Sequence, residues 1–336
     1  MRPRQLLTCF LVGALMAASH AFAWGPDGHH TIGAIADNLI VGTHAAAEVK
    51  TILGDLSLKD ASVWADCVKG IDPGKNYTYQ SAGKYPECRI YETAELEAEM
   101  SDFVRRNDKN CNPKAGEESC HKQYHYTDVA IQHDHYDRSF VGTRNDDIVS
   151  AVVAATHVLR GDAAPAPFNL KDKREALLVL AHYVGDIHQP LHVGAVYLDT
   201  KGKRVNPDAE PFFDPQTDTR GGNKIMIKGA DKNMHAMWDE LPASLTASHV
   251  NAAMLKDAEA LPVTDGEVFD WPTIWASDTL KMARQAFDKL KFGNLRNGHW
   301  STMLPAKYSL DMDSIKKTQL VKAGAHLAQV LQAIWP

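Results

Sequence analysis

Apolar residues recur at intervals of three and four along most of the chain, which is the spacing of one face of an α-helix. This pattern predicts helices over residues 29–54 (broken near Gly42), 144–160, 173–189, 230–240, 248–260, 269–290 and 313–334. One short segment, "NKIMIK" at 223–228, alternates apolar and polar residues instead and predicts a strand. Helices are therefore the main predicted elements.

Two long segments interrupt this pattern. Residues 70–121 are rich in Gly, Pro, Asn and Lys, and they predict a long irregular excursion. Residues 193–222 carry three prolines among many Asp, Gly and Thr residues, and predict a second loop with room for a short β-hairpin. No internal repeat or low-complexity linker divides the chain. We therefore expect one mainly α-helical domain.

The first 23 residues are typical of an export signal. Arg2 and Arg4 precede an apolar run, which ends in "AFA" at 21–23. Cleavage after Ala23 would make Trp24 the first residue of a mature chain over 24–336, and would predict a secreted or periplasmic protein. No later apolar run is long enough to cross a bilayer.

Composition limits how the protein can attract an anionic partner. Hydrophobic residues make up 44% of the chain, and removal of the signal would lower the formal net charge from −6 to −8. A protein that binds nucleic acid through its surface charge is usually basic. Attraction for an anionic substrate must therefore come from a local source, such as bound cations.

Four cysteines follow the signal: Cys67, Cys88, Cys111 and Cys120. An even number in an exported chain predicts two disulfides, with three possible connectivities. The short loops that they close favour the pairs Cys67–Cys88 and Cys111–Cys120. Free or metal-bound thiols are the alternative, although no C-x-x-C pair is present to favour it.

The densest group of titratable residues lies in "LAHYVGDIHQPLH", residues 180–192. His182 and Asp186 are four residues apart, so they share one face of the predicted helix. His235 and Asp239 in "MHAMWDEL" have the same spacing. An imidazole and a carboxylate on one helix face suit zinc or a similar ion. His192 follows Pro190, where the helix should kink or end, so it can face a different ion.

Further candidate ligands lie outside the predicted helix interiors. They are Asp66 in "SVWADCVK", His125 in "QYHYTD", and His29 and His30 in "WGPDGHH". A single His/Asp pair on a helix is also consistent with a solvated face or an ordinary polar pair. The spacing alone thus leaves two interpretations open, a site for several zinc ions and a set of unrelated polar pairs.

The ordered motifs "WGPDGH", "WAD", "HYTD", "HYVGDIHQPLH", "GGN" and "MHAMWD" span Trp24 to Asp239. In this order and spacing the sequence resembles the S1/P1 nuclease family (mung bean nuclease type), which are secreted nucleases with three zinc ions. The related bacterial zinc phospholipases C share the fold and most of the ligands, but they end the third zinc site with Glu. The Asp239 of this chain and its "GGN" motif favour the nuclease, with phospholipid as the alternative substrate.

The resemblance implies a ligand set for three Zn²⁺ ions. Nine residues occupy the family's ligand positions: Trp24, His29, Asp66, His125, His182, Asp186, His192, His235 and Asp239. One ion would be held by Asp66, His125, His182 and Asp186, and a second by the amine and carbonyl of Trp24 with His29 and Asp186. The third would be held by His192, His235 and Asp239. His30, His133, His135 and His188 have no ligand role in this scheme.

The resemblance also implies an activity. Two close zinc ions sharing a water would lower its pKa, and the resulting hydroxide would attack phosphorus in line and leave 5′-phosphates. Single-stranded RNA and DNA are the implied substrates of a monomeric endonuclease that is also a 3′-nucleotidase. A purely structural zinc protein is the remaining alternative, but its sites would normally be closed by four protein ligands.

Substrate contacts are implied at four positions. Lys69 stands where the family has an Arg that contacts phosphate, and with Asp66 it is the candidate for a catalytic role. Tyr126 would stack on a base, Asp128 would bind a base edge, and Asn223 of "GGN" would lie beside the substrate. Arg220 replaces an apolar residue, and the loop over 193–220 is longer than in fungal members. We expect this loop to wall the cleft and alter access for structured substrates.

Overall fold

The computed structural model describes residues 24–336 except 115–116 and 210. The predicted export signal at 1–23 lies outside the described residues. The described residues form a single, mainly helical domain, as the apolar periodicity predicts, and they also contain four small sheets. None of the described helices combines the length and apolar character needed to span a membrane.

Except for the helix at Ala94–Asn107, the longer helices follow the predicted order, with their boundaries shifted. They are α1 (Pro26–Leu39), α2 (His44–Leu53), α5 (Ala94–Asn107), α7 (Ile148–Arg160), α8 (Lys173–Asp186), α11 (Ala252–Glu259), α12 (Trp271–Asp288) and α13 (Tyr308–Ile334). The shorter α-helices are α3 (Leu58–Ala61), α4 (Trp64–Val68), α6 (Cys120–Gln123), α9 (Pro190–Val193) and α10 (Met234–Asp239). Five 3-10 turns lie at Pro73–Lys75, Pro86–Tyr91, Pro215–Thr217, Ala243–Leu245 and Ala247–His249.

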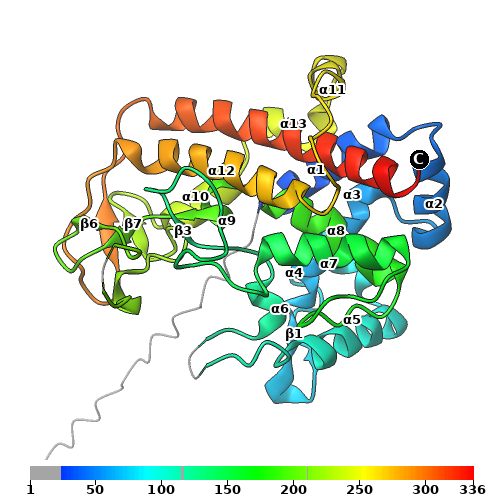
Figure 1. Cartoon of the computed structure of the whole chain (residues 1–336), viewed down its shortest axis with the longest axis horizontal. Coiled ribbons are helices and arrows are strands. Elements are labelled where there is room, and N and C mark those ends of the chain that lie inside the picture. Colours follow the sequence, from blue (N-terminus) through cyan, green and yellow to red (C-terminus); the bar gives the residue numbers. More distant parts are fainter. Residues whose placement is uncertain (1–23, 115–116, 210) are drawn as a thin grey trace, which may run out of the picture.

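Helix α8 lies at the centre of the fold. It contacts α1, α2, α3, α4, α7 and α13, and every residue from Glu175 to Asp186 is buried (Figure 1). A helix surrounded in this way is apolar on all sides, so its few polar side chains need partners inside the protein. The long helices α12 and α13 run side by side along one edge of the domain (Figure 1).

The turn after α8 separates its two sets of polar residues. The side chain of Asp172 caps the start of the helix by accepting a hydrogen bond from the backbone of Glu175. The helix ends at Asp186, and Pro190 begins the short α9. The Gln189 side chain accepts a hydrogen bond from the backbone of Leu191, which stabilises the start of α9. The helix therefore ends instead of kinking at Pro190, and His192 lies on a separate helix from His182.

The strands occur in pairs. β1 (Ile71–Asp72) pairs antiparallel with β2 (Thr78–Tyr79), and β3 (Val129–Ala130) pairs parallel with β4 (Gly194–Ala195). β5 (Tyr197–Leu198) and β6 (Arg204–Val205) form the hairpin for which the 193–222 loop has room. β7 (Ile225–Ile227) confirms the strand at 223–228. It pairs parallel with β8 (Trp300–Thr302), which the sequence pattern does not predict.

One prediction for the 70–121 segment was wrong. It contains a regular helix, α5, with apolar Met100, Phe103 and Val104 buried on one face. Thr93 caps its start, acidic residues fill its first turn, and Arg105 and Arg106 lie in its last turn. These are the usual helix signals. The Gly and Pro content of the surrounding loops concealed them in the composition of the whole segment.

Both favoured disulfides are present. Cys67 bonds Cys88 and Cys111 bonds Cys120. The first bridge joins α4 to the 3-10 turn at Pro86–Tyr91, directly beside Asp66. The irregular 70–121 segment is therefore tied to α4 next to the candidate ligand Asp66.

Candidate metal centre

Three predicted ligands meet at the carboxyl end of α8. Asp186 Oδ2 lies 2.9 Å from His125 Nδ1 and 3.1 Å from His182 Nε2, and the two ring nitrogens are 3.1 Å apart. His182 Nδ1 donates to the Ser62 carbonyl at 2.6 Å, so the proton of the neutral ring is on Nδ1. Its Nε2 therefore presents a lone pair to His125 and Asp186, which is the usual arrangement of a metal-binding histidine.

The second oxygen of Asp186 faces a different residue. Asp186 Oδ1 lies 3.3 Å from His29 Nε2 on α1, and the His29 ring stacks on His182 with centroids 3.9 Å apart. Asp186 Oδ1 and both His29 nitrogens are buried without a hydrogen-bond partner. Buried polar atoms are rarely left unsatisfied. The two oxygens of Asp186 thus face two neighbouring groups of donors, which fits a carboxylate that bridges two ions.

A further cluster unites His192, His235 and Asp239. His192 Nδ1 donates to the His125 carbonyl at 2.7 Å, and His235 Nδ1 donates to the Gly221 carbonyl at 2.9 Å. The two Nε2 atoms are 3.0 Å apart, and Asp239 Oδ2 is 3.9 Å from His235 Nε2. Two neutral rings cannot share a hydrogen bond through two lone pairs. A cation between them accounts for the contact, so this cluster also fits a metal ion.

Asp66 on α4 closes the central cluster from the opposite side. Its Oδ1 lies 3.8 Å from His182 Nε2 and 4.0 Å from His125 Nδ1. The same oxygen accepts a hydrogen bond from Lys69 Nζ at 2.7 Å, one turn along the chain. Asp66 therefore lies between the candidate metal ligands and the partly buried ammonium group of Lys69.

The pKa shifts of His29, His235, Asp66 and Asp186 favour metal binding. Burial, followed by the nearby His182, lowers the pKa of His29 to about 4, and burial followed by His192 lowers that of His235 to about 3. Burial raises the pKa of Asp66, but Lys69 and His182 outweigh it and hold that pKa at about 2. His182 and His192 likewise hold the pKa of Asp186 well below its usual range, against burial. Neutral imidazoles and charged carboxylates are the forms that bind zinc.

Trp24 lies beside both groups of ligands. It is fully buried, and its indole Nε1 donates to the Gly185 carbonyl at 3.0 Å, next to Asp186. The next residue, Gly25, donates its backbone N–H to the Asp239 carbonyl at 2.9 Å. The start of the described chain is therefore packed between α8 and α10, although these helices are far apart in the sequence.

The predicted substrate residues Tyr126, Asp128 and Asn223 differ in burial and in hydrogen bonding. Tyr126 directly follows His125 and is half-buried. Asp128 is buried, and burial followed by repulsion from Asp218 raises the pKa of its carboxyl well above the usual value. Asn223 donates its side-chain amide to the Arg220 carbonyl at 3.0 Å, which leaves its amide oxygen as an acceptor.

Three further histidines have polar partners outside these clusters. His188 is buried. Its Nδ1 donates to the Val184 carbonyl, and its Nε2 forms a hydrogen bond with His326 Nδ1 at 2.7 Å. His133 bonds Asp208 at 2.7 Å, and the exposed His135 bonds Asp134.

Two residues near the centre, Gln189 and Lys316, were not predicted from the sequence. Gln189 donates its amide to Asp239 Oδ1 at 2.8 Å and thereby orients that carboxyl. Its position between His188 and Pro190 in the histidine-rich segment is the sequence signal that indicates a polar role for Gln189. Lys316 is buried behind α10, and nothing in the spacing of a charged residue on a long helix distinguishes it from an exposed lysine.

Comparisons with known proteins support one family. The model of the family described as S1/P1 Nuclease matches residues 24–336. Endonuclease 5 of Arabidopsis thaliana is 23% identical over 94% of this chain and 91% of its own length. Endonucleases 4 and 2 of the same plant are each 25% identical, over 94% and 96% of this chain and 90% and 94% of their own lengths. The chain therefore belongs to the S1/P1 nuclease family and is a hydrolase.

Proposed function

We propose that the protein is a zinc-dependent endonuclease that hydrolyses the phosphodiester bonds of single-stranded RNA and DNA to 5′-phosphorylated products, and that it is also a 3′-nucleotidase. The observation that carries this proposal is the convergence of buried His and Asp side chains around Asp186, whose two oxygens face different donors. Nitrogen and carboxylate oxygen are donors that zinc prefers. The positive ions would give this acidic protein a local attraction for phosphate.

Three zinc ions are assigned to the residues of these clusters and to Trp24. His125, His182, Asp66 and Asp186 would hold the first, and His29 with Asp186 and the backbone of Trp24 the second. His192, His235 and Asp239 would hold the third, which leaves room for a non-protein ligand because zinc usually has four. Bound zinc would lower the pKa of a water molecule and stabilise negative charge on phosphoryl oxygens.

Asp66 and Lys69 supply the catalytic groups of the protein itself. The low pKa of Asp66 keeps its carboxylate charged, so its oxygen can accept a hydrogen bond from the attacking water and orient it. Burial opposes the charge of Lys69, but Asp66 and Asp186 outweigh it and raise the pKa of the ammonium. Lys69 therefore remains a cation at neutral pH and can bind a phosphate oxygen as a point charge.

The bases of the substrate are assigned to Tyr126, Asp128 and Asn223. Stacking on an aromatic ring needs an unpaired base, which favours single strands over duplexes. Burial, followed by repulsion from Asp218, raises the pKa of Asp128 and so favours its protonated form, which can donate a hydrogen bond to a base. The Arg220 guanidinium is exposed beside this group, and we assign the 193–220 loop as a wall that limits access for structured substrates.

Export would make the second ion site complete. We propose that residues 1–23 are a signal peptide, that the mature enzyme is a secreted or periplasmic monomer with one catalytic domain over 24–336, and that cleavage frees the Trp24 amine for zinc. Zinc needs an unprotonated amine, which an uncleaved chain lacks. The disulfides Cys67–Cys88 and Cys111–Cys120 are consistent with export.

The decisive experiment uses protein beginning at Trp24, loaded with zinc and then treated with a chelator. Single-stranded RNA, single-stranded DNA and phosphatidylcholine are offered in parallel, and the product ends are identified. Chelator-sensitive release of 5′-phosphorylated nucleotides, with slower lipid turnover, is expected. Rapid release of phosphocholine with intact nucleic acid would refute the nuclease assignment and favour a phospholipase C.

A further inference from the structure

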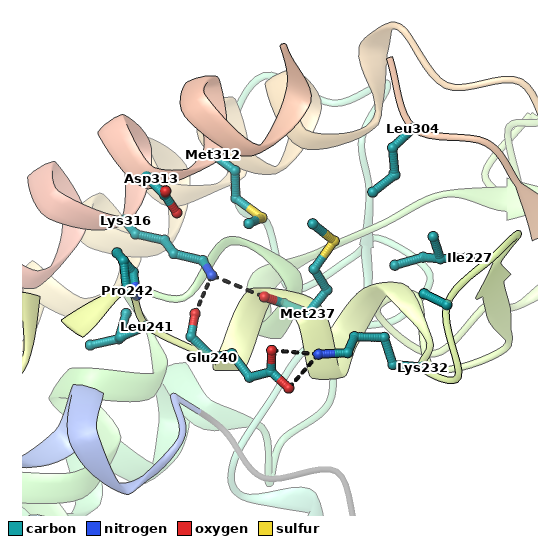
Figure 2. Close-up of a pocket in the computed structure, with 11 residues that line it drawn as sticks. Ile227, Lys232, Met237, Glu240, Leu241, Pro242, Leu304, Met312, Asp313 and Lys316 are labelled. Atoms are coloured by element: carbon teal, nitrogen blue, oxygen red, sulfur yellow. Dashed lines mark hydrogen bonds and ion pairs between the residues drawn. The ribbon is translucent and has the colours of Figure 1, made fainter. Parts of the chain in front are cut away.

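A buried lysine lies behind the helix that carries two of the proposed ligands. Lys316 on α13 is only 1% exposed, although lysines are rarely buried without a partner. Its Nζ donates to the Met237 carbonyl at 2.9 Å and also to the Glu240 carbonyl (Figure 2). Both acceptors lie at the carboxyl end of α10, where backbone carbonyls have no partner within the helix.

The charge at this position suits the end of a helix. The carboxyl end of a helix carries a partial negative charge, which a buried cation stabilises. The ammonium also lies 6.0 Å from the centroid of the Trp238 ring. Burial lowers the pKa of Lys316 to about 8, although the nearby carboxylates of Asp313, Asp239 and Glu240 act to raise it. The group is therefore mainly charged at neutral pH.

The segment held by Lys316 is part of the third metal site. Asp239 lies between the two residues whose carbonyls bind the ammonium, and its own carbonyl accepts the N–H of Gly25. The side chain of Asp239 is held in turn by Gln189. α13 behind the helix and the N-terminal segment in front of it therefore hold the same turn of backbone.

We propose that Lys316 is a positioning residue that holds the carboxyl end of α10 so that His235 and Asp239 face His192 and retain the third zinc ion. The inference rests on the proposed zinc sites, because without a metal at this cluster there would be nothing to retain. Outer partners of metal ligands typically change metal affinity by about 10-fold to 100-fold. Loss of Lys316 is therefore expected to weaken the binding of the third zinc ion and to leave the binding of the other two unchanged.

The test is the rate at which fully loaded protein releases each zinc ion to a chelator, measured with a coloured zinc indicator. Lys316→Met is expected to release one of three zinc ions at least about tenfold faster than the wild type, and Lys316→Arg to restore slow release. The adjoining pocket, about 330 Å³ in volume, gives either side chain room. If Lys316→Met is insoluble, Lys316→Gln, which keeps a donor without the charge, takes its place.

The matched control is Lys322→Met on the same helix. Lys322 pairs instead with Asp278 on α12. Equal acceleration by both methionine variants, or unchanged release from Lys316→Met, would overturn the inference and leave the zinc assignment intact. A separate variant, Asp239→Asn, checks the metal site itself. If wild type and Asp239→Asn contain the same number of zinc ions, the third site is wrong and the inference falls with it.

Discussion

Replacing Asp186 with Asn should remove two zinc ions, whereas replacing any other proposed ligand side chain should remove one. Asp186 Oδ2 lies within 3.1 Å of both His125 Nδ1 and His182 Nε2, while Oδ1 faces His29 Nε2 at 3.3 Å. Asn has nearly the same shape, but it keeps only one oxygen and loses the charge. It can therefore act as an acceptor on one side only, and its amide nitrogen would point at the other group of donors.

The size of the effect follows from what the two ions would supply. Stabilisation of transition-state charge by a metal ion is worth several kcal/mol. A loss of about 4 kcal/mol lowers the rate by roughly 10³-fold. Asp186→Asn is therefore expected to lower kcat/KM on single-stranded RNA by at least about 10³-fold. Because the substitution keeps the buried volume, the fold should survive at neutral pH.

The assay is zinc content by elemental analysis after dialysis, alongside nuclease activity. Asp239→Asn is the matched control, because it makes the same change in a cluster where the carboxylate faces a single pair of histidines, His192 and His235. It should lose one ion where Asp186→Asn loses two. Equal zinc content in the two variants would refute the bridging role of Asp186.

Four further predictions concern other parts of the molecule. Removing the Cys67–Cys88 bridge by double substitution with Ala should lower the free energy of unfolding by about 3 kcal/mol, because the bridge closes a loop with a sequence separation of 21. Denaturant titration under non-reducing conditions checks this, and a loss below about 1 kcal/mol would contradict it. Burial lowers the pKa of His121 to about 3, so the unfolded chain binds a proton below about pH 6.5 that the folded protein does not. The free energy of unfolding should therefore decrease as the pH is lowered below about 6.5. In His121→Leu this decrease should be smaller by about 1.4 kcal/mol per pH unit, which denaturant unfolding at pH 7 and pH 5 would measure. Tyr126→Leu should raise KM for single-stranded DNA by about 10-fold through lost base stacking, and an unchanged KM would exclude the ring from the substrate site. An extra residue before Trp24 should abolish binding of one zinc ion, and full zinc content in such a protein would exclude the free amine as a ligand.

The local part of the structure was predictable from the sequence. Helix positions, the turn at Pro190 and the pairing of His with Asp four residues later depend on neighbours within one or two turns. Such relations hold wherever the helix is placed in the fold. The same local rules would have found α5 had its Thr93 cap and charged ends been weighed separately from the surrounding loops.

The grouping of those residues was decided by tertiary structure. His29, His125 and His182 are far apart in the chain, and only the packing of α1 and α8, with the segment after α6, brings them to the two oxygens of Asp186. The parallel pairing of β7 with β8 and the contact of Lys316 with α10 likewise join segments more than 70 residues apart. Periodicity records which face of an element is apolar, but it does not record which distant element covers that face. The sequence therefore determined the elements and the donor types, and packing determined which donors meet.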